Sequence, residues 1–143
     1  MNVLFVCTGN ICRSPTAEGI ARDRYPDLAT YSSAGTIAIR GSAPSRPAIA
    51  AAAELGIDIS DLRGSPLSKA SRTLPDHVYV MTERHRERVL AALPGLAERV
   101  ELLDPAGEIA DPYGLDLDFY RQTRDQIARA IDARAVEWRR DSE

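Results

Sequence analysis

The residue types that could carry out chemistry are concentrated in one short segment near the start of the chain, Cys7-Thr8-Gly9-Asn10-Ile11-Cys12-Arg13-Ser14-Pro15. A thiolate at Cys7 would be a nucleophile, and the guanidinium of Arg13 offers a planar fork of donors that matches two phosphoryl oxygens. Gly9 and Asn10 tolerate positive φ, so they allow the backbone to curl until its N–H groups point inward. We therefore expect residues 8–14 to bind a phosphoryl group beside a cysteine nucleophile.

The residues on either side of this segment support a functional interpretation. The apolar run at residues 3–6 predicts a buried strand, and Pro15 suits the first position of a following helix. Ser14 is placed either to cap that helix or to donate a hydrogen bond to the thiolate. A lone cysteine after a buried strand is more often a small apolar residue than a nucleophile. The spacing from Cys7 to Arg13, with glycine and asparagine between them, favours the nucleophile.

Cleavage of a phosphoester also needs an acid, because the leaving oxygen departs poorly as an anion. Two aspartates precede proline, Asp104-Pro105 and Asp111-Pro112, and proline restricts the residue before it to an extended conformation. Either aspartate could instead begin a turn, which is the commoner role of this pair. The residues alone leave both as candidate acids. Tyr113 would add an aromatic wall beside Asp111.

The two histidines do not predict a metal site. His77 and His85 lie eight residues apart with no cluster of cysteines near them, unlike ligand pairs at i and i+4. The glycine-containing segment is not a nucleotide-binding loop either, because no lysine follows a second glycine in the required pattern. We expect neither a metal nor an organic cofactor.

Composition indicates an ordinary globular protein. The chain has 143 residues, 44% of them hydrophobic and 27% charged, which predicts one domain over residues 1–143. A net charge of −3 argues against nucleic acid as a partner. No apolar stretch approaches the roughly 20 residues that cross a bilayer, and no signal peptide is recognisable. Two cysteines do not make a disulfide framework. We expect a cytoplasmic monomer without nucleic-acid or membrane partners.

The pattern along the chain predicts strands that alternate with helices. Strands are expected at residues 3–6, 29–34, 78–81 and 100–103, and helices at 15–24, 46–55, 83–93 and 117–138. This alternation predicts an α/β fold: a single doubly wound domain with a four-stranded parallel sheet and helices on both faces. Ligands of such folds bind at the carboxyl ends of the strands, where Cys7 lies.

Helical spacing predicts which residues face the core. The expected buried positions are Ala17, Ile20 and Ala21 in the first helix, Ile49, Ala52 and Ala53 in the second, and Leu117, Tyr120, Ile127, Ile131, Ala135 and Trp138 in the last. The small residues of the second helix suggest close packing on the sheet. Residues 134–143 read as a solvated helix face and a frayed tail.

The segment VCTGNICRSPTAE resembles the active-site signature of the low-molecular-weight protein tyrosine phosphatases. Residues 32–36, 56–59 and 111–114 also resemble that family, and the similarity covers essentially all 143 residues. The resemblance implies that Cys7 forms a phosphocysteine and that Asp111, not Asp104, is the acid. It also implies that Asn10, Ser14 and Ser33 support the loop. Cys12 is either a packed thiol or, as the resemblance favours, the partner that traps an oxidised Cys7 as a disulfide.

The identity of the phosphorylated residue is less sharply indicated. Within the resembling family one branch acts on phosphotyrosine and another on phosphoarginine, and the arginine branch carries threonine where this chain has Ile11. Residues 64–68 and 120–125 nevertheless resemble the arginine branch. The rim departs from the tyrosine pattern, since Ile37 or Ile39 falls where an aromatic residue usually stacks on the substrate. Because Ile11 would touch the reacting centre, we expect a phosphotyrosine phosphatase, with a protein arginine phosphatase as the alternative.

Two other classes of function are remote alternatives. An arsenate reductase of this fold needs downstream cysteines to relay a disulfide, and none follows Cys12. A non-catalytic phosphate-binding module would explain the loop but not the acid at Asp111. The expected partner is therefore a phosphorylated protein substrate.

Overall fold

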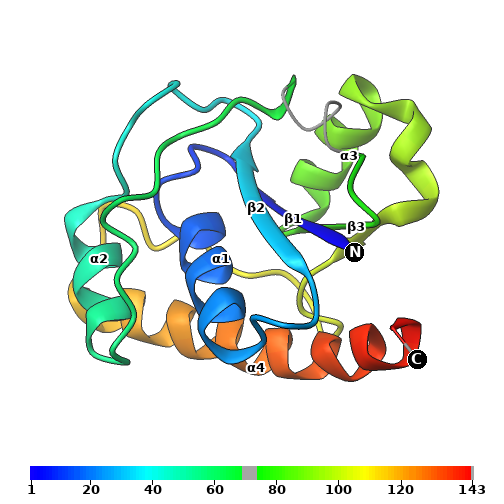
Figure 1. Cartoon of the computed structure of the whole chain (residues 1–143). Helices are drawn as coiled ribbons and strands as arrows, with labels where there is room; N and C mark the ends of the chain where they lie inside the picture. Colours follow the sequence, from blue (N-terminus) through cyan, green and yellow to red (C-terminus); the bar gives the residue numbers. More distant parts are fainter. Residues whose placement is uncertain (69–73, 143) are drawn as a thin grey trace.

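A four-stranded parallel sheet forms the centre of the protein in the computed structural model, which describes residues 1–68 and 74–142 (Figure 1). The strands are β1 (Asn2–Cys7), β2 (Thr30–Gly35), β3 (His77–Val80) and β4 (Val100–Leu102), in the spatial order β2-β1-β3-β4. The helices are α1 (Arg13–Arg24), α2 (Arg46–Ala53), α3 (Glu83–Ala92) and α4 (Leu117–Asp141). The predicted α/β class and the parallel pairing of four strands are confirmed.

Alternating side chains of β1 divide the core into two layers. Val3 and Phe5 belong to the layer that includes α1, α2 and α4, whereas Leu4 and Val6 pack in the layer with α3. Trp138, from the last helix, is fully buried in the first layer, where its Nε1 donates to the Tyr79 hydroxyl at 2.9 Å. Helices therefore cover both faces of the sheet, as the apolar runs of its strands require.

The packing of two helices differs from the prediction. Helix α2 packs against α1 and α4 rather than on the sheet, and Ala53 is exposed while Ala48 and Ala51 are buried. Its small residues permit a close approach between helices. Helix α4 continues to Asp141, and Arg134 is buried, because its guanidinium donates to the carbonyls of Leu102 and Leu103 beyond β4. That part of the terminal segment is not a solvated face.

Shorter differences occur at the ends of the elements. Helix α1 begins at Arg13, so Pro15 is its third residue, where a missing N–H still costs no helical hydrogen bond. A 3₁₀ helix, η2 (Pro94–Arg99), was not predicted. The predicted cap of α3 is confirmed, because the Thr82 side chain accepts from the backbone N–H of His85. Among the described residues, no helix is both long and apolar enough to span a membrane.

The strand order places β1 at the point where successive connections of the sheet proceed toward opposite edges. Strand β2 lies on one side of β1 and β3 on the other, so the segment that leaves β1 enters the space between diverging connections (Figure 1). Residues 8–12 fill that space and lead directly into α1.

Candidate active site

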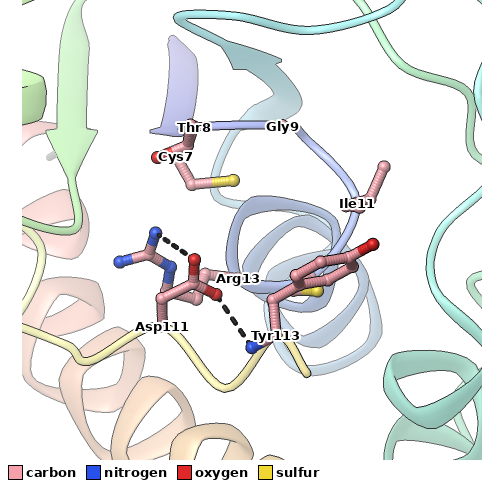
Figure 2. Close-up of a pocket in the computed structure, with 8 residues that line it drawn as sticks. Cys7, Thr8, Gly9, Ile11, Arg13, Asp111 and Tyr113 are labelled. Carbon is pink, nitrogen blue, oxygen red and sulfur yellow. Dashed lines mark hydrogen bonds and ion pairs between the residues drawn. The ribbon is translucent and has the colours of Figure 1, made fainter. Parts of the chain in front are cut away.

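A pocket of about 200 Å³ lies at the carboxyl end of β1 (Figure 2). Its lining consists of Cys7, Thr8, Gly9, Ile11, Cys12, Arg13, Asp111 and Tyr113. All eight were singled out from the sequence, so the fold brings the loop after β1 and the segment before α4 to one place. The other predicted site residues, Asn10, Ser14 and Ser33, do not line the pocket, and their side chains are hydrogen-bonded to one another.

The carbonyl groups of the loop point away from the pocket. The carbonyls of Cys7 and Thr8 accept from the N–H groups of Thr36 and Ile37, each at 2.9 Å, and the carbonyl of Ile11 accepts from Ser45 at 2.8 Å. Because the C=O and the following N–H of a planar trans peptide point in opposite directions, these contacts turn the next N–H groups toward the loop interior. The backbone thus offers donors to an anion above the N-terminus of α1.

Asn10 makes the turn of the loop. Its φ is 58°, so of the two residues that tolerate positive φ, Asn10 adopts it and Gly9 does not. The side chain of Asn10 is buried, and its Oδ1 accepts from the backbone N–H of Ser65 at 2.9 Å. Gly35 lies close behind, since a Cβ on it would come within 2.6 Å of the Thr8 carbonyl oxygen. The loop is therefore held by β2 and by the segment near residue 65.

A chain of hydrogen bonds runs from the thiol of Cys7 to a buried carboxylate. The sulfur of Cys7 lies 3.0 Å from Ser14 Oγ, and Asn10 Nδ2 donates both to Ser14 Oγ at 2.7 Å and to Ser33 Oγ at 3.0 Å. Ser33 in turn donates to Glu18 Oε1 at 2.6 Å. Ser14 accepts from Asn10, so its own proton can be donated either to a thiolate at Cys7, 3.0 Å away, or to the more distant Ala34 carbonyl at 3.5 Å. Of the two roles predicted for Ser14, the contact with the thiol is observed and a helix cap is not.

Arg13 is buried with part of its guanidinium unpaired. Its Nη1 donates to the Ile109 carbonyl at 2.9 Å, and its Nη2 lies 3.6 Å from Asp111 Oδ2. Its Nε is also buried and has no hydrogen-bond partner within the described residues. A buried donor without a partner costs free energy, so the Arg13 side chain retains capacity to donate to a bound anion.

The two candidate acids occupy different environments. Asp111 lines the pocket with a half-exposed side chain, and its carboxyl group lies between the Arg13 guanidinium and the Tyr113 N–H, which donates at 3.0 Å (Figure 2). Asp104 instead accepts from the N–H of Ala106 and from Gln126 Nε2, so it initiates a turn and anchors α4. Of the two, only Asp111 lines the pocket.

Cys12 lies on the buried side of the pocket. Its sulfur lies 3.3 Å from Ser45 Oγ and 3.6 Å from the Tyr120 hydroxyl. Burial raises the pKa of the Cys12 thiol above its usual value, although the hydrogen bonds to Ser45 and Tyr120 oppose the rise. Burial also raises the pKa of Tyr120, to about 12. Cys12 is therefore a neutral thiol near pH 7 and not a second anionic nucleophile.

The histidines have partners within the protein. His77 Nε2 lies 3.2 Å from Asp141 Oδ2, at the end of α4. His85 is buried, and its ring contacts the hydroxyl groups of Thr8 and Thr82. Within residues 1–68 and 74–142, no group of three or more histidine, cysteine or carboxylate side chains is arranged to hold a metal ion.

Ile37 and Ile39, one of which was expected to lie where an aromatic residue stacks on the substrate, do not line the pocket, whereas Tyr113 does. The exposed fractions of Ile37, Ile39 and Tyr113 are 63%, 76% and 64%. Ile37 is tied to the loop through its hydrogen bond to Thr8, and the side chain of Ile11 lies on the same side of the pocket as Tyr113 in Figure 2. At residue 11 the pocket is therefore lined by a branched apolar side chain without a hydroxyl group.

Three contributions to the site were not predicted from the sequence: Glu18, His85 and the backbone N–H of Ser65. Glu18 lies one helical turn after Ser14, and a carboxylate on an apolar helix face is the signal that could have identified it. No signal exists for the other two, because their contacts depend on tertiary structure.

Comparisons with known proteins agree with this geometry. The sequence model of the family described as low molecular weight phosphotyrosine protein phosphatase matches residues 2–142. A protein-arginine-phosphatase of Geobacillus stearothermophilus is 34% identical over 135 residues, which cover 91% of this chain and 90% of that protein. The low molecular weight protein-tyrosine-phosphatase Wzb of Escherichia coli K12 is 33% identical over 140 residues, which cover 96% and 92%.

Solved structures show the same fold. The YwlE arginine phosphatase from Geobacillus stearothermophilus superposes with a TM-score of 0.91 at 32% identity, covering 98% of this chain and 94% of that one. Vibrio vulnificus Wzb in complex with benzylphosphonate superposes with a TM-score of 0.90 at 29% identity, covering 95% and 97%. Proteins named for arginine and for tyrosine are thus similarly related to this chain.

Proposed function

Because the chain belongs to the low molecular weight phosphotyrosine protein phosphatase family, we propose that it removes phosphate from phosphotyrosine in proteins through a phosphocysteine at Cys7. The observation that carries this proposal is the buried, unpaired Nε of Arg13 in a pocket that also contains the Cys7 thiol. A phosphoryl dianion would satisfy that donor together with the inward N–H groups of the loop. The chain is a phosphatase by its family, and the roles of individual residues are our proposal.

In the first step the Cys7 thiolate attacks phosphorus and the bond from phosphorus to the phenolic oxygen breaks. The leaving oxygen takes a proton from Asp111, so the products are a free tyrosine hydroxyl, a phosphocysteine and an ionised Asp111. Asp111 is suited to this role because its carboxyl group lies at the pocket and is half exposed. A phosphoryl dianion bound by Arg13 would compete with Asp111 for the guanidinium, which would leave the Asp111 carboxyl group available to the leaving oxygen.

In the second step water attacks the phosphocysteine. Asp111 accepts a proton from that water, the bond from sulfur to phosphorus breaks, and Cys7 leaves as a thiolate with inorganic phosphate as product. The Ser14 hydroxyl, 3.0 Å from the sulfur, stabilises the thiolate in both the attacking and the leaving roles. Asp111 is then protonated again for the next substrate.

The preference for phosphotyrosine rests on Ile11 and Tyr113. Both line the pocket, and they offer apolar surface to an aromatic ring. Ile11 has no hydroxyl with which to assist attack on a phosphorus bonded to nitrogen. An aryl ester needs no such assistance, since its leaving group is good and Asp111 protonates it.

Protein arginine phosphatase is the second candidate. The protein-arginine-phosphatase of Bacillus subtilis is 30% identical over 149 residues, and the Geobacillus stearothermophilus protein is 34% identical. The half-exposed carboxylate of Asp111 would also attract a guanidinium group. This candidate is tested by the same comparison of substrates.

The decisive experiment compares kcat/KM on one peptide carrying phosphotyrosine and on a matched peptide carrying phosphoarginine. We expect higher kcat/KM on phosphotyrosine, and a reversed order would replace the first candidate with the second. In parallel, Cys7→Ser should abolish turnover of p-nitrophenyl phosphate but retain vanadate binding, because the loop amides and Arg13 remain. Turnover by the serine variant would contradict a phosphocysteine, and no turnover by the wild type would indicate a phosphate-binding module.

A further inference from the structure

His85 connects helix α3 to the residue that follows the nucleophile. Its Nε2 lies 2.7 Å from the Thr8 hydroxyl oxygen, which is the shorter of its two ring contacts. Its Nδ1 lies 3.1 Å from the hydroxyl oxygen of Thr82, the residue that caps α3. The imidazole is 4% exposed, so both contacts are made away from bulk water. His85 is thus fixed at one nitrogen by its own helix and at the other by the phosphate-binding loop.

The hydrogen bonds around Thr82 favour one tautomer of the His85 ring. Thr82 Oγ1 already accepts from the backbone N–H of His85, so its own proton is best used as a donor to Nδ1. Nε2 then carries the imidazole proton and donates it to Thr8 Oγ1. This arrangement uses both ring nitrogens of a buried, neutral histidine.

The charges near His85 are compatible with a neutral ring. Burial and the positive charges of Arg13 and Arg88 together lower the pKa of His85 to about 4, although Asp111 and Glu108 act in the opposite direction. A neutral imidazole adds no charge that would compete with Arg13 for the phosphoryl group. It can therefore hold Thr8 at every pH at which a thiolate nucleophile operates.

We propose that His85 is a positioning residue that holds Thr8, and through Thr8 the start of the phosphate-binding loop, in its anion-binding shape. Two hydrogen bonds hold Thr8: its carbonyl accepts from the Ile37 N–H, and its hydroxyl contacts His85 Nε2. It adjoins Cys7 in the chain and lines the pocket (Figure 2). Without the contact to His85, the hydrogen bond from Ile37 to the Thr8 carbonyl would have to orient the peptide between Thr8 and Gly9 with one contact fewer, so its N–H donor would be less well aligned. This inference rests on the proposed function, because it assumes that the loop binds a phosphoryl group.

The test is a double-mutant cycle that reads anion binding rather than activity alone. His85→Phe keeps the ring but removes both nitrogens, Thr8→Val keeps the branched shape but removes the hydroxyl, and the third variant combines them. We expect each single change to weaken the binding of inorganic phosphate about tenfold, and the double variant to be no weaker than the weaker single one. His85→Gln, which can place an amide donor near Thr8, should restore most of the affinity.

The remaining histidine supplies the matched control. His77→Gln removes a histidine that contacts the end of α4, and it should leave phosphate binding and kcat/KM within twofold of the wild type. In this variant His85 is the single histidine, so two-bond proton–nitrogen spectra should show a neutral imidazole with its proton on Nε2 between pH 8 and pH 6.

Two results would overturn the proposal. Unchanged phosphate affinity in His85→Phe, with only a lower melting temperature, would show that His85 serves stability alone. Additive losses in the double variant would show that Thr8 and His85 do not act through one another. Phosphate titration detects both results even if the wild type hydrolyses no phosphopeptide, so failure of the proposed function is recognised separately, by the activity assay.

Discussion

The hydroxyl of Ser33 lies 2.6 Å from a carboxylate oxygen of Glu18 and donates its proton to it. That contact sets the direction of the hydrogen bonds that lead to Cys7. Because the Ser33 hydroxyl donates to Glu18, it acts as an acceptor toward the Asn10 amide. The second N–H of that amide donates to Ser14. Ser14 is left as a donor to the Cys7 sulfur. A buried carboxylate thus influences which group donates toward the Cys7 sulfur without touching that sulfur.

Glu18→Gln should therefore lower activity even though Glu18 lies outside the pocket. A glutamine amide can donate to Ser33, which removes the fixed direction of the chain. We expect kcat on p-nitrophenyl phosphate to fall roughly tenfold, equivalent to about 1.4 kcal/mol, the order of one hydrogen bond to a charged group. The exposed residue Glu98 supplies the control, and Glu98→Gln should leave kcat unchanged. Equal rates for all three proteins would show that the direction of the chain does not matter.

The two aspartates that precede proline should differ in their effect on catalysis. Asp111→Asn should lower kcat on aryl phosphates by roughly 10²–10⁴-fold, which is the usual contribution of general acid–base catalysis. Asp104→Asn should change kcat much less, because Asp104 contacts Ala106 and Gln126 rather than the pocket. Asp104→Asn should instead lower the free energy of unfolding, which urea denaturation measures. A larger kcat loss in Asp104→Asn would show that the acid was assigned to the wrong residue.

We expect Cys12 to make the oxidative inactivation of Cys7 reversible. Mild peroxide should inactivate the wild type with formation of a disulfide between Cys7 and Cys12, and thiols should restore activity. In Cys12→Ser the sulfenic acid at Cys7 has no resolving thiol and should proceed to sulfinic acid, so the loss becomes permanent. Recovery of activity and intact-protein mass spectrometry distinguish these outcomes. Equal recovery in both proteins would show that Cys12 only packs against Ser45 and Tyr120.

The pKa of His85 predicts a specific pH dependence of stability. The folded-state pKa of about 4 lies below the ordinary value of 6.5. As the pH falls below 6.5, His85 is therefore protonated in the unfolded chain while it stays neutral in the folded protein. The contribution of neutral His85 to the free energy of unfolding is fully present above pH 6.5. It is lost as the pH falls to about 4, by up to about 3 kcal/mol. Urea unfolding at pH 7.5 and pH 4.5 should therefore show a larger decrease for the wild type than for His85→Phe. Parallel decreases would contradict a buried neutral histidine.

The fold followed from the sequence because its strands and helices carry clear local signals. Continuous apolar runs mark strands that are buried on both faces, and helical spacing placed Trp138 and Ile131 in the core. Arg134 was placed wrongly, because an arginine near a chain end looks solvated until the carbonyls beyond β4 are seen to accept from it. Local patterns do not report such a contact, which joins residues about 30 positions apart.

The site was predictable to the extent that it is local. Cys7 and Arg13 share one loop, and Asp111 needed the family resemblance to be preferred over Asp104. Glu18 and His85 were not recognised, since each acts through a hydroxyl group that another segment supplies. His85 was interpreted as a surface or hydrogen-bonded histidine rather than a metal ligand, and its contact with Thr8 spans 77 residues of sequence. Residues that touch the anion are visible in a motif, whereas residues that hold the motif in shape are not.

Ile11 should control the choice between phosphotyrosine and phosphoarginine. Its side chain lies over Gly9 at the pocket, where a Cβ on Gly9 would be 3.4 Å from Ile11 Cγ1, so residue 11 is close to a bound phosphoryl group. Ile11→Thr keeps a β-branched shape and adds a hydroxyl that can assist attack on a phosphorus–nitrogen bond. The ratio of kcat/KM values should shift about tenfold toward phosphoarginine, equivalent to about 1.4 kcal/mol of transition-state stabilisation. Ile11→Val, which is branched but has no hydroxyl, is the matched control and should leave the ratio unchanged. If the wild type already prefers phosphoarginine, residue 11 does not select the substrate, and the similarity of residues 64–68 and 120–125 to the arginine branch is the better indicator.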